Sequence, residues 1–270
     1  MEQWLVLIVA MLAAGCAAGV LAGLFGIGGG IVIVPVLELI LSFVGVDAAI
    51  RMHIAVATSL AVIVPTSLSS ARAHHMQGAV DLGVVRQWWF FILAGSIFGA
   101  WLASQFHSRV LAAIFATLAL LVGLKLMFVP ERAGLTDGIP RNPLVKGIPT
   151  TIGALSAMMG IGGGTFSVMT LTLFNVPIHR AVGTASLLGL FIALPGAAAF
   201  VASGLSDPRL PAGSLGYVSM IGFACIAPTT VLCAPLGAKI AHAFAADKLK
   251  MLFGLFLAIA AVRMFWRAFA

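Results

Sequence analysis

Charged residues are scarce in this sequence. Asp, Glu, Lys and Arg together make up 9% of its 270 residues, whereas a soluble domain carries about 25%. Hydrophobic residues make up 61%, and the mean hydropathy is +1.15. So much apolar surface cannot be hidden inside a water-soluble protein of this length. The composition therefore excludes a soluble fold and predicts an integral membrane protein.

The few charged residues mark the ends of the predicted membrane segments. Most charge-free stretches approach or exceed the ~20 residues that a membrane-spanning helix needs. A shorter apolar run at 251–262 adds a further candidate. We therefore expect an all-α polytopic membrane protein with about eight transmembrane segments. The seven longer stretches are 3–37, 52–71, 87–108, 110–124, 147–179, 181–206 and 210–238.

Cysteine is also rare, and the groups that enzymes and metal sites need are missing from the pattern. Cys16, Cys225 and Cys233 lie in predicted membrane segments and have no metal-ligand spacing. No Ser/His/Asp arrangement, His-rich cluster or pair of buried carboxylates is evident, so we expect no metal, no cofactor and no enzymatic activity. The N-terminus lacks the basic region of a signal peptide, so the first segment is expected to stay in the mature protein.

Short motifs recur in the same order in the two parts of the chain. GIGGG occurs at 26–30 and again at 160–164, and HIAVATS at 53–59 matches HRAVGTA at 179–185. Matches that keep their order over such a length indicate an internal duplication. We therefore predict two homologous halves of about four segments each, residues 1–129 and 147–270, joined by a polar linker at 130–146.

Each GIGGG motif interrupts a long apolar run, so segments 1 and 5 are predicted to be broken or re-entrant, a feature typical of transporter binding sites. Glycines permit positive φ and let a ligand approach bare amides. The helix that restarts after each break presents free N–H groups and the positive end of its dipole, which suits an anion without any charged side chain. The predicted substrate-binding glycines are Gly26, Gly28, Gly29, Gly30, Gly160, Gly162, Gly163 and Gly164.

A packing role is the alternative for these glycines, because small-residue motifs bring membrane helices close together. Nucleotide binding is disfavoured, since the motif does not complete G-x-G-x-x-G and no Walker lysine follows it. The net charge of +7 is scattered over short loops, which fits anchoring in a lipid bilayer rather than binding to nucleic acid.

Hydroxyl side chains stand near the starts of the segments that follow the breaks. We predict that they contact the substrate, since a hydroxyl can donate to an oxyanion; back-bonding to the preceding helical turn is the alternative. Ser67 and the serines next to it are interpreted as packing residues or as part of a water-lined exit. The predicted substrate-binding hydroxyls are those of Thr58, Ser59, Thr184 and Ser186.

His53 and His179 occupy matching positions in the two halves. They are either anchors at the membrane interface or groups that couple transport to protons, because imidazole titrates near neutral pH. Arg180 is the cation best placed to draw an anion toward the second half. It would also disfavour protonation of His179 by like-charge repulsion, which makes His53 the favoured proton carrier.

Together these motifs resemble the TauE/SafE family of sulfite exporter-like membrane proteins, over essentially the whole chain. The resemblance implies an anion transporter, with family members assigned to sulfite, sulfonates such as sulfoacetate and other sulfur-containing anions. Met169 stands where the first half has Pro35, which implies that the two halves contact the substrate unequally. The matching stretches are GLFGIGGGIVIVPVL at 23–37, AVATSL at 55–60, HHMQGAVDL at 74–82 and AVGTASL at 181–187.

The sequence thus predicts a secondary transporter that exports a small sulfur-containing anion across a bacterial inner membrane by alternating access. An anion channel and a membrane scaffold subunit without transport of its own are the alternatives. The expected partners are the small anionic substrate and the lipid bilayer. The pattern leaves open the orientation of the N-terminus, whether the repeats are parallel or inverted, and whether the protein is a monomer or a homodimer.

Overall fold

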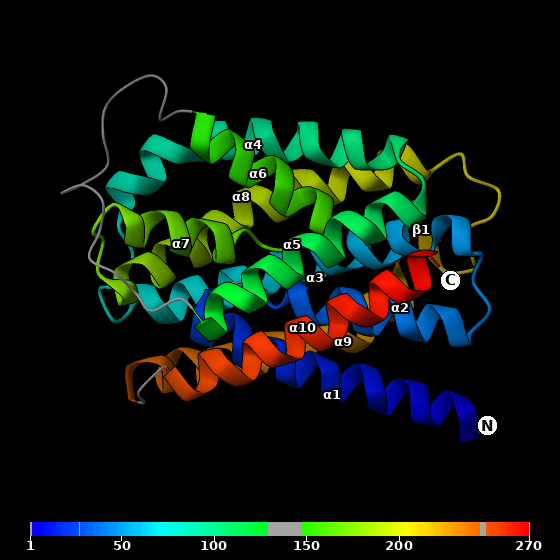
Figure 1. Ribbon diagram of the computed structural model, residues 1–270, viewed down its shortest axis with the longest axis horizontal. Helices are drawn as coiled ribbons and strands as arrows, with labels where there is room; N and C mark the ends of the chain where they lie inside the picture. Colours follow the sequence, from blue (N-terminus) through cyan, green and yellow to red (C-terminus); the bar gives the residue numbers. More distant parts are fainter. Residues whose placement is uncertain (1, 27, 129–146, 244–246, 270) are drawn as a thin grey trace.

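A computed structural model describes residues 2–26, 28–128, 147–243 and 247–269. Within these ranges the chain folds into ten α-helices and one antiparallel β-hairpin (Figure 1). In chain order the elements are α1 (Glu2–Phe25), α2 (Gly30–Phe43), α3 (Ala48–His75), α4 (Leu82–Gln105), α5 (Ser108–Phe128), α6 (Gly147–Met159), α7 (Gly164–Leu173), α8 (Ile178–Gly204), β1 (Ser214–Leu215), β2 (Val218–Ser219), α9 (Met220–Ala243) and α10 (Asp247–Phe269).

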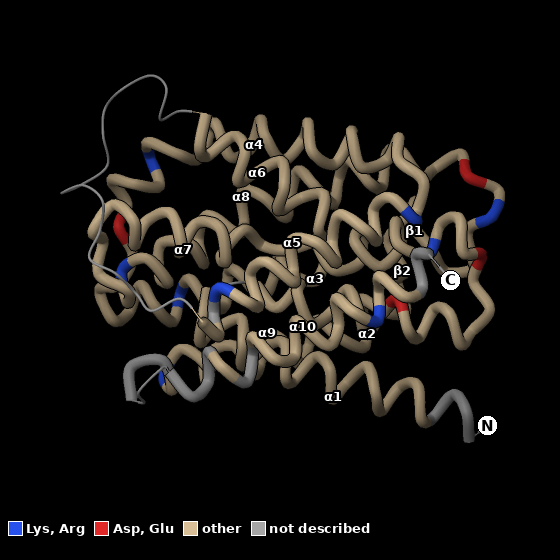
Figure 2. The backbone as a smooth tube through the Cα atoms, in the orientation of Figure 1, with Lys and Arg blue, Asp and Glu red and all other residues tan. Residues whose placement is uncertain are grey.

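Charged residues gather toward the two ends of the helix bundle, and the described residues halfway between these ends are uncharged (Figure 2). Six of the described helices are long and apolar enough to cross a membrane, namely α1, α3, α4, α5, α8 and α9. The predicted all-α membrane fold is therefore confirmed. The predicted total of about eight segments stays a prediction.

Two long interfaces join helices that are far apart in the sequence. α1 packs along α9, and α6 packs along α4. A Cβ built on Gly19 of α1 would lie 2.6 Å from the carbonyl oxygen of Thr230, and one on Gly153 of α6 would clash with the carbonyl oxygen of Ile92. Small residues let membrane helices approach this closely. The helices of the first part of the chain are thereby interleaved with those of the second.

Both predicted helix breaks are present. α1 and α2 are separated at 26–29, and α6 and α7 at 160–163. A positive φ strains any residue with a side chain and cannot continue a right-handed helix. The glycines therefore end one helix and let the next begin in a new direction. Positive φ values occur at Gly26 (68°), Gly28 (70°), Gly29 (78°), Gly160 (68°) and Gly163 (70°).

The helices α3 and α8 run in opposite directions. The start of α3 lies beside the segment that follows α8, since the rings of His53 and Tyr217 are 5.1 Å apart. The start of α8 lies beside the segment that follows α3, since a Cβ on Gly183 would clash with the carbonyl oxygen of Ala79. Figure 1 shows α2 returning toward the end where α1 begins, and α7 returning toward the opposite end, where α6 begins. The two helix hairpins thus enter the bundle from opposite ends.

The predicted polar linker at 130–146 lies entirely outside the described residues. The division into halves at 1–129 and 147–270 stays a prediction. The sequence analysis did not predict the hairpin of β1 and β2. This hairpin lies in the connection between α8 and α9, where Ser214 pairs with Ser219 and Leu215 with Val218.

Candidate functional site

The two glycine breaks touch each other inside the bundle. A Cβ built on Gly28 would lie 3.3 Å from the Cα of Gly162, and one built on Gly30 would clash with the carbonyl oxygen of Gly160. All four glycines are buried. Motifs that are far apart in the sequence therefore meet at one place in the fold.

Each break leads into a helix N-terminus that has no side-chain cap. Gly29 precedes α2 with a φ of 78°, and Gly163 precedes α7 with a φ of 70°. In α7 the amide of Ser167 donates to the carbonyl oxygen of Gly163 at 2.8 Å, so the amides of the turn before it have no partner within the helix. Such amides, aided by the helix dipole, bind anions. The geometry has the elements of an anion site.

The Cα faces of two of these glycines lie against protein. A Cβ on Gly29 would be 2.7 Å from the carbonyl oxygen of Ala18, and one on Gly163 would clash with the side chain of Ile192. A larger residue at either position would therefore be strained by its φ and by lack of space. It follows that a glycine-to-valine change here would disturb folding as well as the binding of any ligand.

Thr58 and Thr184 each hold the start of a helix that is distant in the sequence. Thr58 Oγ1 accepts a hydrogen bond from the amide of Ser219 at 2.9 Å, and Thr184 Oγ1 accepts one from the amide of Asp81 at 2.9 Å. Ser219 and Asp81 immediately precede α9 and α4. Both threonines are fully buried. Each hydroxyl oxygen therefore has a structural role, and its contact with substrate stays a prediction.

Ser59 and Ser186 also have protein partners. Ser59 Oγ donates to the carbonyl oxygen of Gly160 at 2.7 Å, which ties α3 to the second break. Ser186 Oγ donates to the carbonyl oxygen of Val182 at 3.0 Å and lies 3.2 Å from Ser70 Oγ. The bond to Val182 is the back-bonding to the preceding turn that the sequence left as the alternative.

The two histidines have different surroundings. His53 is 4% exposed, and its Nε2 lies 3.1 Å from the carbonyl oxygen of Phe106. His179 and Arg180 are exposed at the start of α8. The hydrogen bond and the ring contact of His53 are with Phe106 and Tyr217, away from the glycine breaks. The roles of the three residues in proton coupling and anion entry stay predictions.

Four buried hydroxyls beside the second break were not among the predicted site residues. No hydrogen-bond partner for any of their oxygens is found among the described residues. The signal in the sequence was that three of them flank the second GIGGG motif at positions where the first half has Ala or Ile. The four residues are Ser67, Ser156, Thr165 and Ser167.

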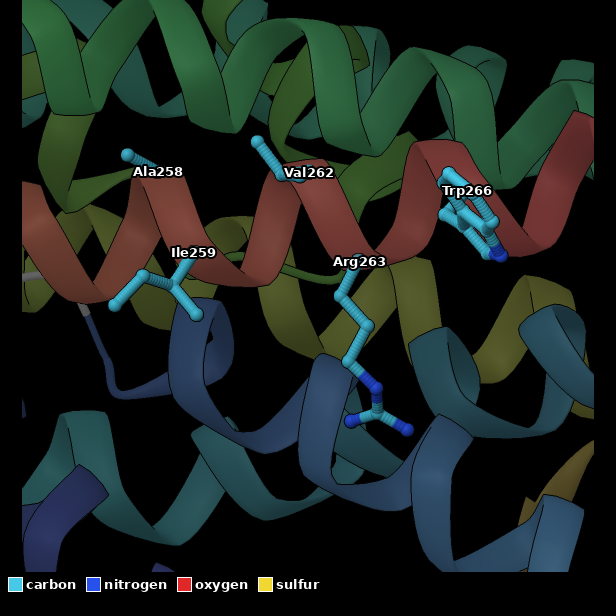
Figure 3. A pocket seen from close by; sticks show the side chains of 5 residues that line it. All are labelled: Ala258, Ile259, Val262, Arg263 and Trp266. Atoms are coloured by element: carbon cyan, nitrogen blue, oxygen red, sulfur yellow. The ribbon is translucent and has the colours of Figure 1, made fainter.

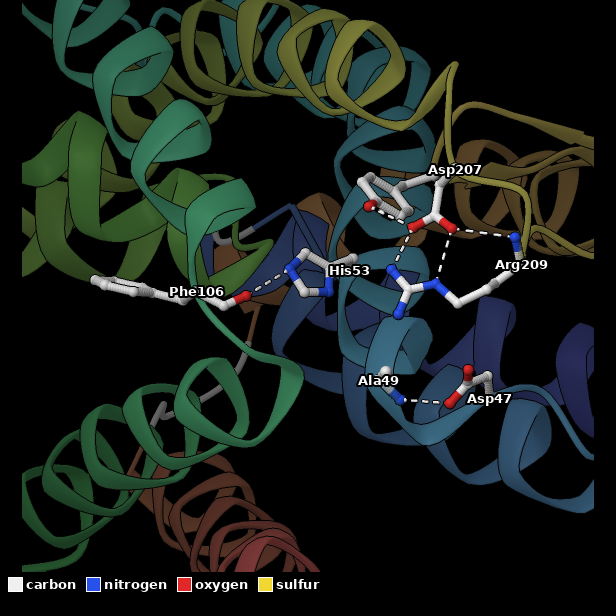
Figure 4. A network of polar contacts seen from close by, with 7 residues as sticks. Asp47, Ala49, His53, Phe106, Asp207 and Arg209 are labelled. Carbon is white, nitrogen blue, oxygen red and sulfur yellow. Dashed lines mark hydrogen bonds and ion pairs between the residues drawn. The ribbon is translucent and has the colours of Figure 1, made fainter.

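A polar network lies at the end of the bundle where α3 begins (Figure 4). The Asp207 carboxylate accepts hydrogen bonds from the Arg209 side chain at 2.7 and 2.9 Å and from the Tyr217 hydroxyl at 2.9 Å. The bonds from Arg209 hold the pKa of the Asp207 carboxyl well below its usual range. Burial, followed by the hydrogen bond to Asp207, raises the pKa of Tyr217 to about 12. The network fixes the segment between α8 and α9 beside His53.

A metal site and a surface groove are the two other kinds of site to consider. Among the described residues, no group of three or more His, Cys, Asp or Glu side chains could hold a metal ion. An open groove on α10 includes none of the glycines of the breaks, and its lining comes from one helix (Figure 3). It is therefore not the predicted anion site. The groove is lined by Ala258, Ile259, Val262, Arg263 and Trp266.

Six apolar helices of spanning length, together with two broken helix hairpins that meet inside the bundle, define a multi-pass α-helical membrane protein of the transporter class. The comparison with known families is more specific. The chain belongs to the sulfite exporter TauE/SafE family, whose sequence profile matches residues 11–264. The resemblance seen in the sequence is thereby confirmed.

Curated relatives are named as transporters. A "Probable membrane transporter protein" of Haemophilus influenzae is 34% identical over 253 residues, which cover 93% of this chain and 95% of the relative. "Probable membrane transporter protein YunE" of Bacillus subtilis is 30% identical and covers 70% and 77% of the two chains. "Probable membrane transporter protein MJ0441" of Methanocaldococcus jannaschii is 25% identical, with 87% and 84% covered. No solved structure matches the chain significantly.

Proposed function

We propose that this protein is a secondary transporter that moves a small sulfur-containing oxyanion, such as sulfite or a sulfonate like sulfoacetate, out of the cell across the bacterial inner membrane. The observation that carries the proposal is the meeting of the two glycine breaks. Each break leads into a helix N-terminus without a side-chain cap, and the breaks are in contact inside an apolar bundle. Backbone amides at such termini bind anions.

The directions of the two helix hairpins support a mechanism of alternating access. One hairpin enters the bundle from each end (Figure 1), as expected for two inverted repeats around a central site. Rocking one half against the other would open the contact between the breaks first to one side of the membrane and then to the other. A duplication in inverted form would supply the two states that such a cycle requires.

An oxyanion with three or more oxygens suits a site made of amides and hydroxyls. These donors are neutral and point at separate oxygens, so a sulfite or sulfonate group uses more of them than a carboxylate does. No charged residue occurs at 147–179, the stretch that contains the second break. We therefore expect selectivity for sulfur oxyanions over carboxylates.

The proposal is tested by ligand binding to the purified full-length protein. Sulfite, sulfate, thiosulfate, sulfoacetate and acetate are added one at a time, and thermal unfolding is followed. A ligand at 100 times its dissociation constant adds about 2.7 kcal/mol of stability. We expect sulfite or sulfoacetate to raise the melting temperature and acetate to have little effect. If no sulfur anion stabilises the protein, and none is transported across the membrane of liposomes that contain it, the transporter assignment is wrong and a scaffold role is favoured.

Flux measurements in liposomes separate a transporter from a channel. A transporter gives flux that saturates with anion concentration and is driven uphill by a second gradient. A channel gives flux that only follows the electrochemical gradient of the anion. Saturable, gradient-coupled flux is the expected result, and ohmic, non-saturating conductance would favour the channel.

Proton coupling is tested in the same liposomes by measuring flux against pH. His53 is buried beside Phe106, whereas His179 is exposed next to Arg180. We expect His53→Gln to remove the pH dependence and His179→Gln to keep it. A double variant with the wild-type pH profile would show that neither histidine couples transport to protons.

A further inference from the structure

The second break is surrounded by hydroxyl groups that the fold itself does not use. Ser156 and Ser167 are 0% exposed, Ser67 is 1% exposed and Thr165 is 7% exposed. Their oxygens have no hydrogen-bond partner among the residues that the structure describes. Leaving a buried hydroxyl unpaired is costly, and native proteins rarely do so without a functional reason. These four groups therefore need a partner that is not part of the described chain.

The hydroxyls approach the break from two different helices. A Cβ built on Gly163 would lie 3.3 Å from Ser156 Oγ, in the last turn of α6. A Cβ built on Gly189 would lie 2.8 Å from Ser67 Oγ of α3 and 2.7 Å from the carbonyl oxygen of Gly162. Thus Ser156 Oγ and Ser67 Oγ both lie close to residues 162–163, directly before the start of α7.

The other two hydroxyls belong to the first turns of α7 itself. Thr165 and Ser167 follow the cap residue Gly163, which has a left-handed backbone and no side-chain cap. Their hydroxyls lie at the helix end whose first backbone N–H groups have no partner within the helix. Hydroxyls and amides together make this helix end rich in uncharged donors, and the positive end of the helix dipole favours an anion there.

The first break has no such groups. In the repeat alignment the counterparts of Ser156, Thr165 and Ser167 are Ala22, Ile31 and Ile33, and the counterpart of Ser67 is Ala193. These four residues are 0% exposed and apolar. The unpaired hydroxyls therefore gather at the second break, whereas the hydroxyls nearest the first break, those of Ser59 and Ser186, donate to carbonyl oxygens.

Resting on the proposed function, we propose that the oxyanion head group of the substrate binds at the N-terminus of α7, where Ser67, Ser156, Thr165 and Ser167 donate hydrogen bonds to its oxygens. The first break then acts as an apolar wall that packs against the bound anion. This assigns substrate contacts to residues that the sequence pattern did not single out. It also makes the two halves of the protein unequal in binding.

The test uses single variants of the full-length protein, with sulfite and sulfoacetate as probes. Ser67→Ala, Ser156→Ala, Ser167→Ala and Thr165→Val each remove one donor to a charged ligand, so the affinity should fall about tenfold or more. Without ligand their melting temperatures should stay unchanged or rise, because the removed hydroxyl was unpaired. A lower affinity together with an undiminished melting temperature is the signature of a ligand contact.

Two control variants remove hydroxyls that are already paired. Ser69 Oγ on α3 donates to the carbonyl oxygen of Val231 at 3.0 Å, and Thr170 Oγ1 on α7 donates to that of Phe166 at 2.8 Å. Ser69→Ala and Thr170→Val should keep the wild-type affinity. Wild-type affinity in all four test variants would overturn this site while leaving the transporter function intact. Failure of the wild-type protein to bind either probe would overturn both.

Discussion

Replacing Ser59 with alanine isolates the link between α3 and the second glycine break. The Ser59 hydroxyl is fully buried and donates to the carbonyl oxygen of Gly160 at 2.7 Å. The variant leaves that carbonyl without this donor. Hydrogen bonds between membrane helices average about 0.6 kcal/mol and reach about 1.7 kcal/mol, while stranding a buried acceptor costs about 1–3 kcal/mol. Because Gly160 lies in the buried interior, we expect a loss of about 1–2 kcal/mol.

The assay is thermal unfolding of the purified protein without ligand, followed by titration with sulfite. A loss of this size lowers the melting temperature by about 2–8 °C in a chain of comparable length. Anion affinity should change little, since the hydroxyl is already committed to Gly160. Ser104→Ala is the matched control, because Ser104 Oγ donates to the carbonyl oxygen of Trp101 at 2.7 Å but is exposed. An unchanged melting temperature with a tenfold weaker affinity would refute the reasoning and make Ser59 a ligand.

Three further predictions concern other parts of the structure. Thr58→Val and Thr184→Val should each lower the unfolding free energy by about 1–2 kcal/mol, since each leaves a partly buried amide without its acceptor; equal stability to wild type would contradict this. Tyr217 is the single tyrosine of the chain, so its ultraviolet absorbance titration should have a midpoint near pH 12, and Asp207→Asn should lower that midpoint. Because the folded-state pKa of Tyr217 is raised, its contribution to stability is complete below about pH 10 and is lost as the pH rises further. Arg180→Gln should weaken the apparent affinity for sulfite more than the maximal flux, and an unchanged affinity would reduce Arg180 to a topology anchor.

The positions of the helix breaks could be predicted because they depend on local chemistry. A run of glycines between apolar residues tolerates positive φ and has a low helix propensity, and both properties are fixed by residue type. The length of the apolar runs gave the membrane fold in the same way. Recurrence of GIGGG at 26–30 and 160–164 then pointed to two matching breaks.

The partners of polar side chains could not be predicted, because they depend on tertiary contacts. Thr58 and Thr184 resemble ligand residues in sequence, yet each accepts a hydrogen bond from the residue that precedes a helix distant in the sequence. The serine and threonine side chains around α7 carried no sequence mark of being unpaired. A serine or threonine hydroxyl offers the same donor and acceptor whether its partner is a carbonyl, a water molecule or a substrate, so the sequence does not reveal the partner. Only the packed arrangement tells these cases apart.

The two histidines show why equivalent sequence positions need not have equivalent functions. His53 lies beside the long connection between α8 and α9, which contains the β-hairpin and Tyr217. The matching connection between α3 and α4 is a short turn at 76–81, so His179 has no comparable cover and is exposed. A similar asymmetry appears at the breaks, where three hydroxyl residues flank the second GIGGG motif and their counterparts at the first motif are Ala or Ile. The two helix hairpins thus enter the bundle from opposite ends, while the side chains around them differ, and we expect those differences to decide where an anion and a proton bind.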